Sequence, residues 1–195
     1  TDKLRDGSAA KSPLSPMLAR GLELMLRTAQ RGGEVFAMRW EDVDEGWWTI
    51  PSTGAKNSQA PRVPLTKAAL KLIAEARADG SGPDGWVFAG PEGGSLHSRA
   101  VKVVPILRNA EVLTGDYWRH DLRRTITTGL QALNIPRSTI WHVLNQQEGG
   151  PRALGAYARH DFSKEKTATL DAWGRHLDAL LTGQTSRVVS GHFRK

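Results

Sequence analysis

Apolar residues recur at helical spacing along much of the chain. Near its start, Leu18, Leu22, Met25 and Leu26 occupy positions i, i+4, i+7 and i+8, which predicts a helix over residues 16–29. Such a periodicity marks the face that a helix buries against the rest of the fold. By the same reasoning, further helices are predicted over residues 67–78, 97–109, 120–132, 137–145, 152–159 and 164–181.

Two of these predicted helices indicate which side should be buried. Thr66 is a suitable cap for the second helix, in which Leu70, Ile73 and Ala74 would face inward. The last helix has one apolar face, formed by Leu170, Trp173, Leu177 and Leu180.

A different pattern lies between the first two of these helices. Residues 47–51 are aromatic and β-branched, which predicts a strand, and residues 62–65 resemble a returning strand at a sheet edge, where proline is tolerated. Turn-forming residues between them place Lys56 near the turn. A short helix is expected to begin near residues 32–34 and to include Arg39. The predicted fold is therefore mainly α-helical with a small antiparallel β-sheet.

The composition restricts the class of protein. Hydrophobic residues make up 39% of the 195 positions and charged residues 24%, as in soluble globular proteins. No apolar run approaches the roughly 20 residues needed to cross a bilayer, so a cytoplasmic protein without membrane association is expected. The chain has no cysteine, which excludes disulfides, thiolate catalysis and Cys-ligated zinc.

The two ends of the chain differ from its centre. Residues 1–15 are polar and contain turn formers, which indicates a linker, and residues 182–195 form a basic tail. One domain is therefore expected over residues 16–181. The first residue is not Met, which points to a fragment of a longer chain.

Positive charge is in excess over the whole chain. Lys and Arg outnumber Asp and Glu by 27 to 20, which gives a net charge of +7 and a pI of about 10. A domain of this kind attracts polyanions, and nucleic acid is the first candidate. A basic surface that only maintains solubility is the alternative.

His120 and Arg123 are three residues apart in a predicted helix, so both lie on one helical face. A guanidinium holds two phosphate oxygens at once, and an imidazole can transfer a proton near neutral pH. Arg124 is four residues from His120 and fits the spacing as well, and a basic surface helix without chemistry would give the same pattern.

Three other residues are candidates for the same chemistry. Arg31 precedes Gly32 and Gly33, which allow close approach of a ligand, although Arg31 and Glu34 also match an ordinary salt bridge at a helix start. A flexible ammonium such as that of Lys56 can donate a proton or be plain surface charge. A tyrosine hydroxyl needs neighbouring cations or a base to act as a nucleophile, and basic residues surround Tyr157.

These residues occur in the order of a known active site. Arg31, Lys56, His120-x-x-Arg123 and Tyr157 together resemble the catalytic domain of the tyrosine recombinases, or phage integrases. The resemblance covers nearly the whole chain. The similar motifs are Arg31-Gly32-Gly33-Glu34-Val35, Gly54-Ala55-Lys56-Asn57, His120-Asp121-Leu122-Arg123-Arg124-Thr125 and Tyr157-Ala158-Arg159-His160-Asp161.

The resemblance implies the fold of the DNA breaking–rejoining enzymes and their mechanism, on double-stranded DNA, as a multimer and with no metal or other cofactor. Tyr157 would form a 3′-phosphotyrosyl bond while the two arginines hold the phosphate oxygens. Lys56 would protonate the leaving 5′-oxygen, and His120 would assist proton transfer at the tyrosine. Glu34 matches the family's acidic position and would orient its neighbours.

One position departs from the family pattern. Leu-Gly-His or Leu-Asn-His usually precedes the tyrosine, whereas this chain has Leu144-Asn145-Gln146. An amide donates a hydrogen bond to a phosphate oxygen but cannot transfer a proton, so weakened cleavage is expected. Two alternatives to a recombinase stay open: a non-catalytic DNA-binding remnant of an integrase, and a type IB topoisomerase, which shares this chemistry.

Overall fold

The computed structural model describes residues 14–51, 60–78, 85–100, 102–111, 119–146 and 162–183, except for the side chains of Arg99, Arg119 and His120. Helices predominate in the described part, and three short strands form one antiparallel sheet. The predicted fold class is therefore confirmed.

Helix α1 (Pro16–Thr28) begins and ends where the sequence predicts, to within one residue. The side chain of Ser15 accepts a hydrogen bond from the Leu18 amide at 3.4 Å, and proline at the first helical position is compatible with the helix. The helix ends at Ala29, whose φ of 60° is left-handed. Leu18, Leu24 and Met25 of α1 are buried in the core.

Helix α3 (Lys67–Ala78) packs beside α1 but with a different face from the one predicted. Ile73 is buried as expected, whereas Ala74 is exposed and Leu70 is 37% exposed. The buried stripe follows the spacing i, i+3, i+4 and i+7 of an amphipathic helix, and it lies one position earlier than predicted. Its members are Ala69, Leu72, Ile73 and Ala76.

The sheet contains β1 (Val43–Asp44), β2 (Trp47–Thr49) and β3 (Arg62–Pro64), in the order β1-β2-β3. The predicted strand pair is confirmed, although both strands are shorter than expected. Trp48 is opposite Val63 in the register, and both side chains are buried, so this pair fixes which face of the sheet joins the core.

Several helix boundaries differ from the prediction. The expected helix over 97–109 is divided into α4 (His97–Ala100) and α5 (Val103–Asn109). The short helix α2 (Gly32–Val35) ends before Arg39, which pairs instead with Trp86 in an isolated β-bridge. The remaining described elements are the 3₁₀-helix η2 (Trp40–Asp42) and helices α6 (Arg119–Ala132), α7 (Arg137–Val143) and α9 (Ser163–Leu181). The predicted helix over 152–159 lies outside the described residues.

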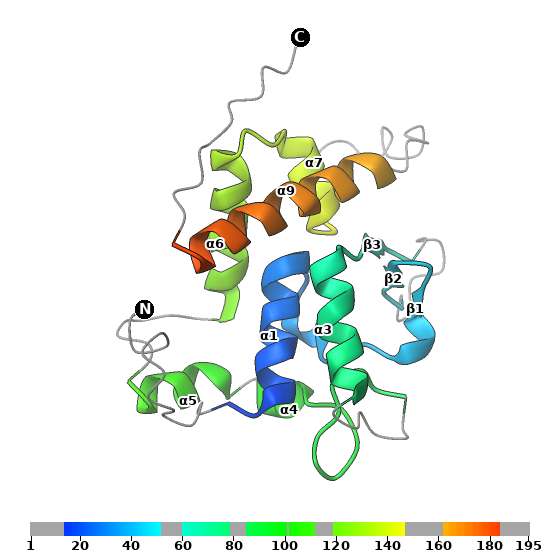
Figure 1. Ribbon diagram of the computed structural model, residues 1–195, viewed down its shortest axis with the longest axis vertical. Coiled ribbons are helices and arrows are strands. Elements are labelled where there is room, and N and C mark those ends of the chain that lie inside the picture. Colours follow the sequence, from blue (N-terminus) through cyan, green and yellow to red (C-terminus); the bar gives the residue numbers. More distant parts are fainter. Residues whose placement is uncertain are drawn as a thin grey trace.

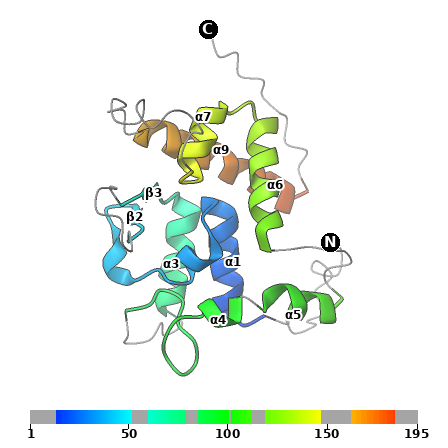
Figure 2. The same ribbon diagram turned by 180° about the vertical axis from the view of Figure 1, so that it is seen from behind.

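Helices α1 and α3 lie side by side in the centre of the molecule, and α6, α7 and α9 gather at one end of them (Figures 1 and 2). Helix α9 is anchored on α1, because the Trp173 indole donates to the Leu26 carbonyl at 2.7 Å and Arg27 pairs with Asp178 at 3.0 Å. Lys166 also donates to the carbonyl of Arg62 in β3 at 3.0 Å.

The predicted apolar face of α9 is confirmed for three of its four members. Leu170, Trp173 and Leu177 are buried, but Leu180 is 59% exposed. Leu180 lies in the last turn, where the neighbouring Leu181 is exposed as well. The periodicity therefore continues one turn beyond the part of the helix that is buried.

Candidate active site

The first predicted site residue, Arg31, is the N-cap of α2. Its backbone amide donates to the Glu34 carboxylate at 2.9 Å, and its guanidinium donates to the other oxygen of that carboxylate at 2.9 Å. The salt bridge considered from the sequence is therefore present. The Arg31 side chain remains 49% exposed, so part of it is accessible to a ligand.

Arg123 lies on α6 and is only 7% exposed. Its Nη2 donates a hydrogen bond to the carbonyl oxygen of Leu144. Within the part of the chain that the structure describes, its Nε and Nη1 atoms are buried and have no hydrogen-bond partner. Because a buried charged donor without a partner is costly, two unfilled donors suggest an acceptor that joins from outside, such as a phosphate oxygen.

The two arginines border one cavity. A hollow of about 900 Å³ has mainly apolar side chains along its length, and Arg31 and Arg123 are both among its lining residues. Burial lowers the pKa of Arg123, the nearby positive charge of Arg31 lowers it further, and Glu34 acts in the opposite direction. Two mutually repelling cations next to one carboxylate form a place where an anion is stabilised.

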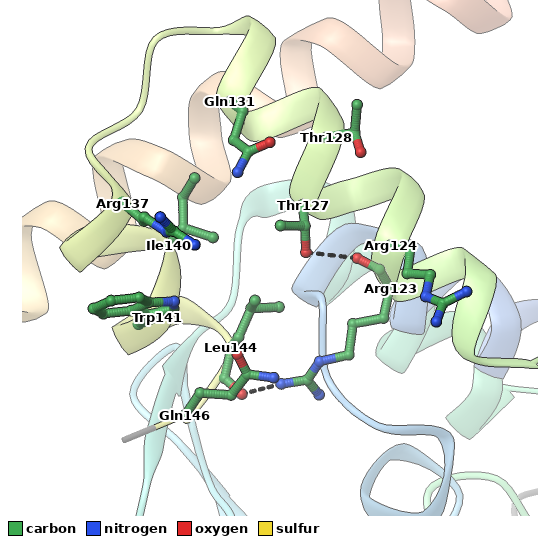
Figure 3. A pocket seen from close by; sticks show the side chains of 10 residues that line it. All are labelled: Arg123, Arg124, Thr127, Thr128, Gln131, Arg137, Ile140, Trp141, Leu144 and Gln146. Carbon is green, nitrogen blue, oxygen red and sulfur yellow. Dashed lines mark hydrogen bonds between the residues drawn. The ribbon is translucent and has the colours of Figure 1, made fainter. Parts of the chain in front are cut away.

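Helices α6 and α7 and the residues that follow α7 line a second pocket, of about 460 Å³, which Arg123 also borders. In Figure 3 the side chains of Arg123 and Gln146 point toward one another. Arg124 and Arg137 also line this pocket, and the guanidinium of Arg137 lies 5.4 Å from the centre of the Trp141 ring. The lining residues are Arg123, Arg124, Thr127, Thr128, Gln131, Arg137, Ile140, Trp141, Leu144 and Gln146.

Four of the seven predicted site residues have described side chains, and three of these, Arg31, Arg123 and Gln146, line the two cavities. Arg31, Arg123 and Glu34 are near one another, and Gln146 lines the pocket that Arg123 also borders. His120 is in the first turn of α6, three residues before Arg123, but its side chain is not described. Lys56 and Tyr157 lie outside the described residues.

The sequence analysis missed a hydrogen-bonded pair of side-chain amides beside these residues. Gln30 precedes Arg31 and is 2% exposed, and its side-chain oxygen accepts a hydrogen bond from Asn145 at 2.7 Å. Asn145 lies between Leu144 and Gln146. The only signal in the sequence was that each amide is adjacent to a candidate site residue.

Comparison with known proteins identifies the family. The family model described as the phage integrase family matches residues 5–162. The chain belongs to the phage integrase family. The resemblance seen in the motifs around Arg31 and Arg123 is thereby confirmed.

Two curated relatives show how much of such an integrase the chain represents. It is 22% identical to prophage integrase IntF of Escherichia coli K12 over 194 residues, which are 95% of this chain and 39% of the relative. It is 34% identical to tyrosine recombinase XerC of Xanthomonas axonopodis pv. citri over 83 residues, which are 42% of this chain and 27% of the relative. The chain thus spans less than half the length of either protein.

Solved structures of integrase-family recombinases share the fold. The catalytic core of lambda integrase matches with a TM-score of 0.55 and 20% identity, over 71% of this chain and 87% of that chain. XerA recombinase matches with a TM-score of 0.52 and 16% identity, over 84% of this chain and 62% of that chain. XerH recombinase bound to palindromic difH substrate matches with a TM-score of 0.55 and 18% identity, over 71% of this chain and 41% of that chain. These likenesses confirm the predicted catalytic-domain fold.

The described residues of the integrase fold lack both a metal-ligand cluster and a membrane-spanning helix. They contain no cluster of three or more His, Asp or Glu side chains that would hold a metal ion. None of their helices combines the length and apolar character of a membrane span.

Proposed function

We propose that this chain is the catalytic part of a site-specific tyrosine recombinase, which cuts and rejoins double-stranded DNA through a 3′-phosphotyrosyl intermediate without a metal ion. The observation that carries the proposal is the state of Arg123, which is buried, close to Arg31 and, among the described residues, left with two donor atoms that have no acceptor. A scissile phosphate supplies the acceptor oxygens and the negative charge that this arrangement requires.

In the proposed reaction, Arg31 and Arg123 bind the non-bridging oxygens of the phosphate, and the amide of Gln146 donates a further hydrogen bond. Negative charge grows on these oxygens in the transition state, so donors fixed in advance stabilise it more than the ground state. Glu34, which holds the Arg31 side chain and backbone together, orients that guanidinium.

The covalent step forms one bond and breaks another. The Tyr157 oxygen attacks phosphorus while His120 assists removal of its proton, the bond from phosphorus to the 5′-oxygen breaks, and Lys56 gives a proton to that oxygen. The described residues on either side of residues 147–161, the segment that contains Tyr157, support the assignment of the nucleophile. Gln146, which begins the connection toward Tyr157, lines the pocket of Arg123, and Phe162, at its other end, stacks on His142 of α7.

Double-stranded DNA is the proposed substrate, in agreement with the net charge of +7. The XerH relatives with the same fold were solved bound to their difH substrate, before and after cleavage. Strand exchange joins ends from two duplexes, so several copies would assemble on the DNA. We assign the catalytic domain to residues 16–181, the linker to residues 1–15 and the basic tail to residues 182–195.

A nicked suicide duplex from the DNA adjoining the gene tests the proposal. The nick lets the short 5′-end diffuse away, so a covalent protein–DNA adduct accumulates. We expect an adduct that survives denaturation, forms in the presence of EDTA and is lost in Tyr157→Phe. Loss of the adduct in EDTA would refute metal independence, and an adduct retained in Tyr157→Phe would refute the assigned nucleophile.

Gln146 motivates one alternative, a DNA-binding remnant that no longer cleaves. If the chain is such a remnant, it should bind the duplex but form no adduct under any condition, including prolonged incubation. The same assay with Gln146→His distinguishes an impaired active site from an absent one, because only an impaired site regains cleavage when the proton-transferring imidazole is restored.

A further inference from the structure

The side chain of Gln30 joins two parts of the site that are far apart in the sequence. Its nitrogen donates to the carbonyl oxygens of Thr28 at 2.7 Å and Val143 at 2.8 Å, and its oxygen accepts from Asn145 at 2.7 Å. Both amide hydrogens are therefore used. Because Gln30 is 2% exposed, water does not compete for these bonds.

Each end of this bridge is covalently next to a phosphate-binding candidate. Gln30 is followed by Arg31, the N-cap of α2. Asn145 is preceded by Leu144, whose carbonyl accepts the hydrogen bond of Arg123, and is followed by Gln146. The bridge therefore links the backbone that carries one guanidinium to the carbonyl that anchors the other.

The backbone at Asn145 is suited to this role. Its φ of 49° is in the left-handed region, which Asn adopts more readily than most residues other than Gly. The turn ends α7 and directs the Asn145 amide to the buried Gln30 oxygen. A glycine would allow the same turn but would contribute no side-chain bond.

We infer that Gln30 and Asn145 are positioning residues, which hold the Arg31 turn against the end of α7 so that both arginines meet one phosphate. The inference rests on the proposed function. Arg31 and Arg123 repel one another while no anion is bound, and a tie between their supports keeps them together before DNA arrives. A neutral amide pair provides that tie without adding a charge that would compete with the phosphate.

The competing explanation is that Gln30 only satisfies buried carbonyl groups and stabilises the fold. The two explanations differ in what they predict for catalysis. A stabilising role predicts that activity falls only as the folded fraction falls. A positioning role predicts that the folded, DNA-bound protein cleaves more slowly, because a misplacement of about 1 Å in a site can slow the reaction by about 100-fold.

The test compares Gln30→Met, Asn145→Gly and the double variant, in the full chain, on the nicked duplex. Methionine has a similar length and shape but no amide, and glycine keeps the left-handed turn. Single-turnover adduct formation is measured at saturating DNA, well below the melting temperature of every variant. Ile73→Val in α3 is the stability control, because it lowers Tm by about 2–4 °C and lies outside the site.

We expect each single variant to form the adduct roughly 10- to 100-fold more slowly, with DNA affinity within about twofold of wild type. The double variant should be no slower than the slower single variant, because the two amides act as one unit. The control should keep the wild-type rate.

Two results would overturn the inference alone: wild-type rates in both single variants, or losses that multiply in the double variant as for independent sites. A wild-type chain that forms no adduct would refute the proposed function, and the positioning role with it. The two failures are therefore distinguishable from one set of reactions.

Discussion

The guanidinium of Arg123 is held by the main chain, through a hydrogen bond from its Nη2 atom to the carbonyl oxygen of Leu144. The carbonyl lies at the end of α7, one residue before Asn145, and Arg123 projects from α6. No described residue accepts a hydrogen bond from the other two buried nitrogens of the arginine. A side chain is thus fixed in place but electrostatically unsatisfied, which is the usual condition of a binding group before its ligand arrives.

Replacement of Arg123 by methionine should separate stability from activity. The variant loses one hydrogen bond but also loses a desolvated charge and its repulsion by Arg31, so we expect the free energy of unfolding to rise by about 0.5–2 kcal/mol. Adduct formation should disappear. Thermal or urea unfolding without DNA checks the first expectation, and a lower stability would show that the Leu144 contact outweighs the cost of the buried charge.

Replacement of Gln146 by histidine should raise the rate of cleavage. Imidazole donates a hydrogen bond as the amide does and also transfers protons near neutral pH. The gain should appear as a pH-dependent single-turnover rate. Gln131→His is the matched control, because Gln131 lines the same pocket from the last turn of α6. An equal or lower rate in Gln146→His, or an equal gain in the control, would contradict the assignment.

The pocket between α6 and α7 should contribute phosphate contacts through Arg137. The Arg137→Ala variant should bind DNA more weakly, to the same extent for all sequences. The slope of the logarithm of the binding constant against the logarithm of the salt concentration should become less steep by about 0.9. Arg175→Ala removes the same charge from an exposed position on α9 that does not line the pocket. Binding titrations at several salt concentrations measure the two slopes. Identical slopes in both variants would exclude a specific contact between Arg137 and a phosphate.

Two helix glycines should respond oppositely to alanine. A Cβ at Gly129 in α6 would lie 2.4 Å from the Trp173 ring, whereas a Cβ at Gly174 in α9 would meet nothing within 4 Å. We expect Gly129→Ala to destabilise the protein by about 1–3 kcal/mol and Gly174→Ala to stabilise it by about 0.5–1 kcal/mol. Chemical denaturation measures both. Equal effects of the two changes would mean that α6 and α9 are not in close contact.

Local patterns in the sequence predicted the helices well but not always their buried faces. In α3, Leu70 and Leu72 are both apolar, and only the packing beside α1 decides that Leu72 is buried and Leu70 exposed. The exposure of Leu180 has the same origin, because a periodic pattern does not show where burial along a helix ends.

The residues of the candidate site that belong to family motifs could be predicted from the sequence, and the others could not. Arg31 and Arg123 were recognisable because they keep a family order, and the structure brings their charges together. The Gln30–Asn145 pair was not, because its members are 115 residues apart and an amide pair has no sequence periodicity. Hydrogen bonds of this kind follow from tertiary packing alone.

The contact between Lys166 and Arg62 has a consequence for solubility. β3 is an outer strand of the described sheet, and outer strands invite pairing with a second chain. An ammonium group from α9 occupies one of its carbonyl groups, and lysine at such an edge discourages aggregation. Helix α9, which also packs against β3, therefore covers part of the edge that this strand would otherwise present to a second chain.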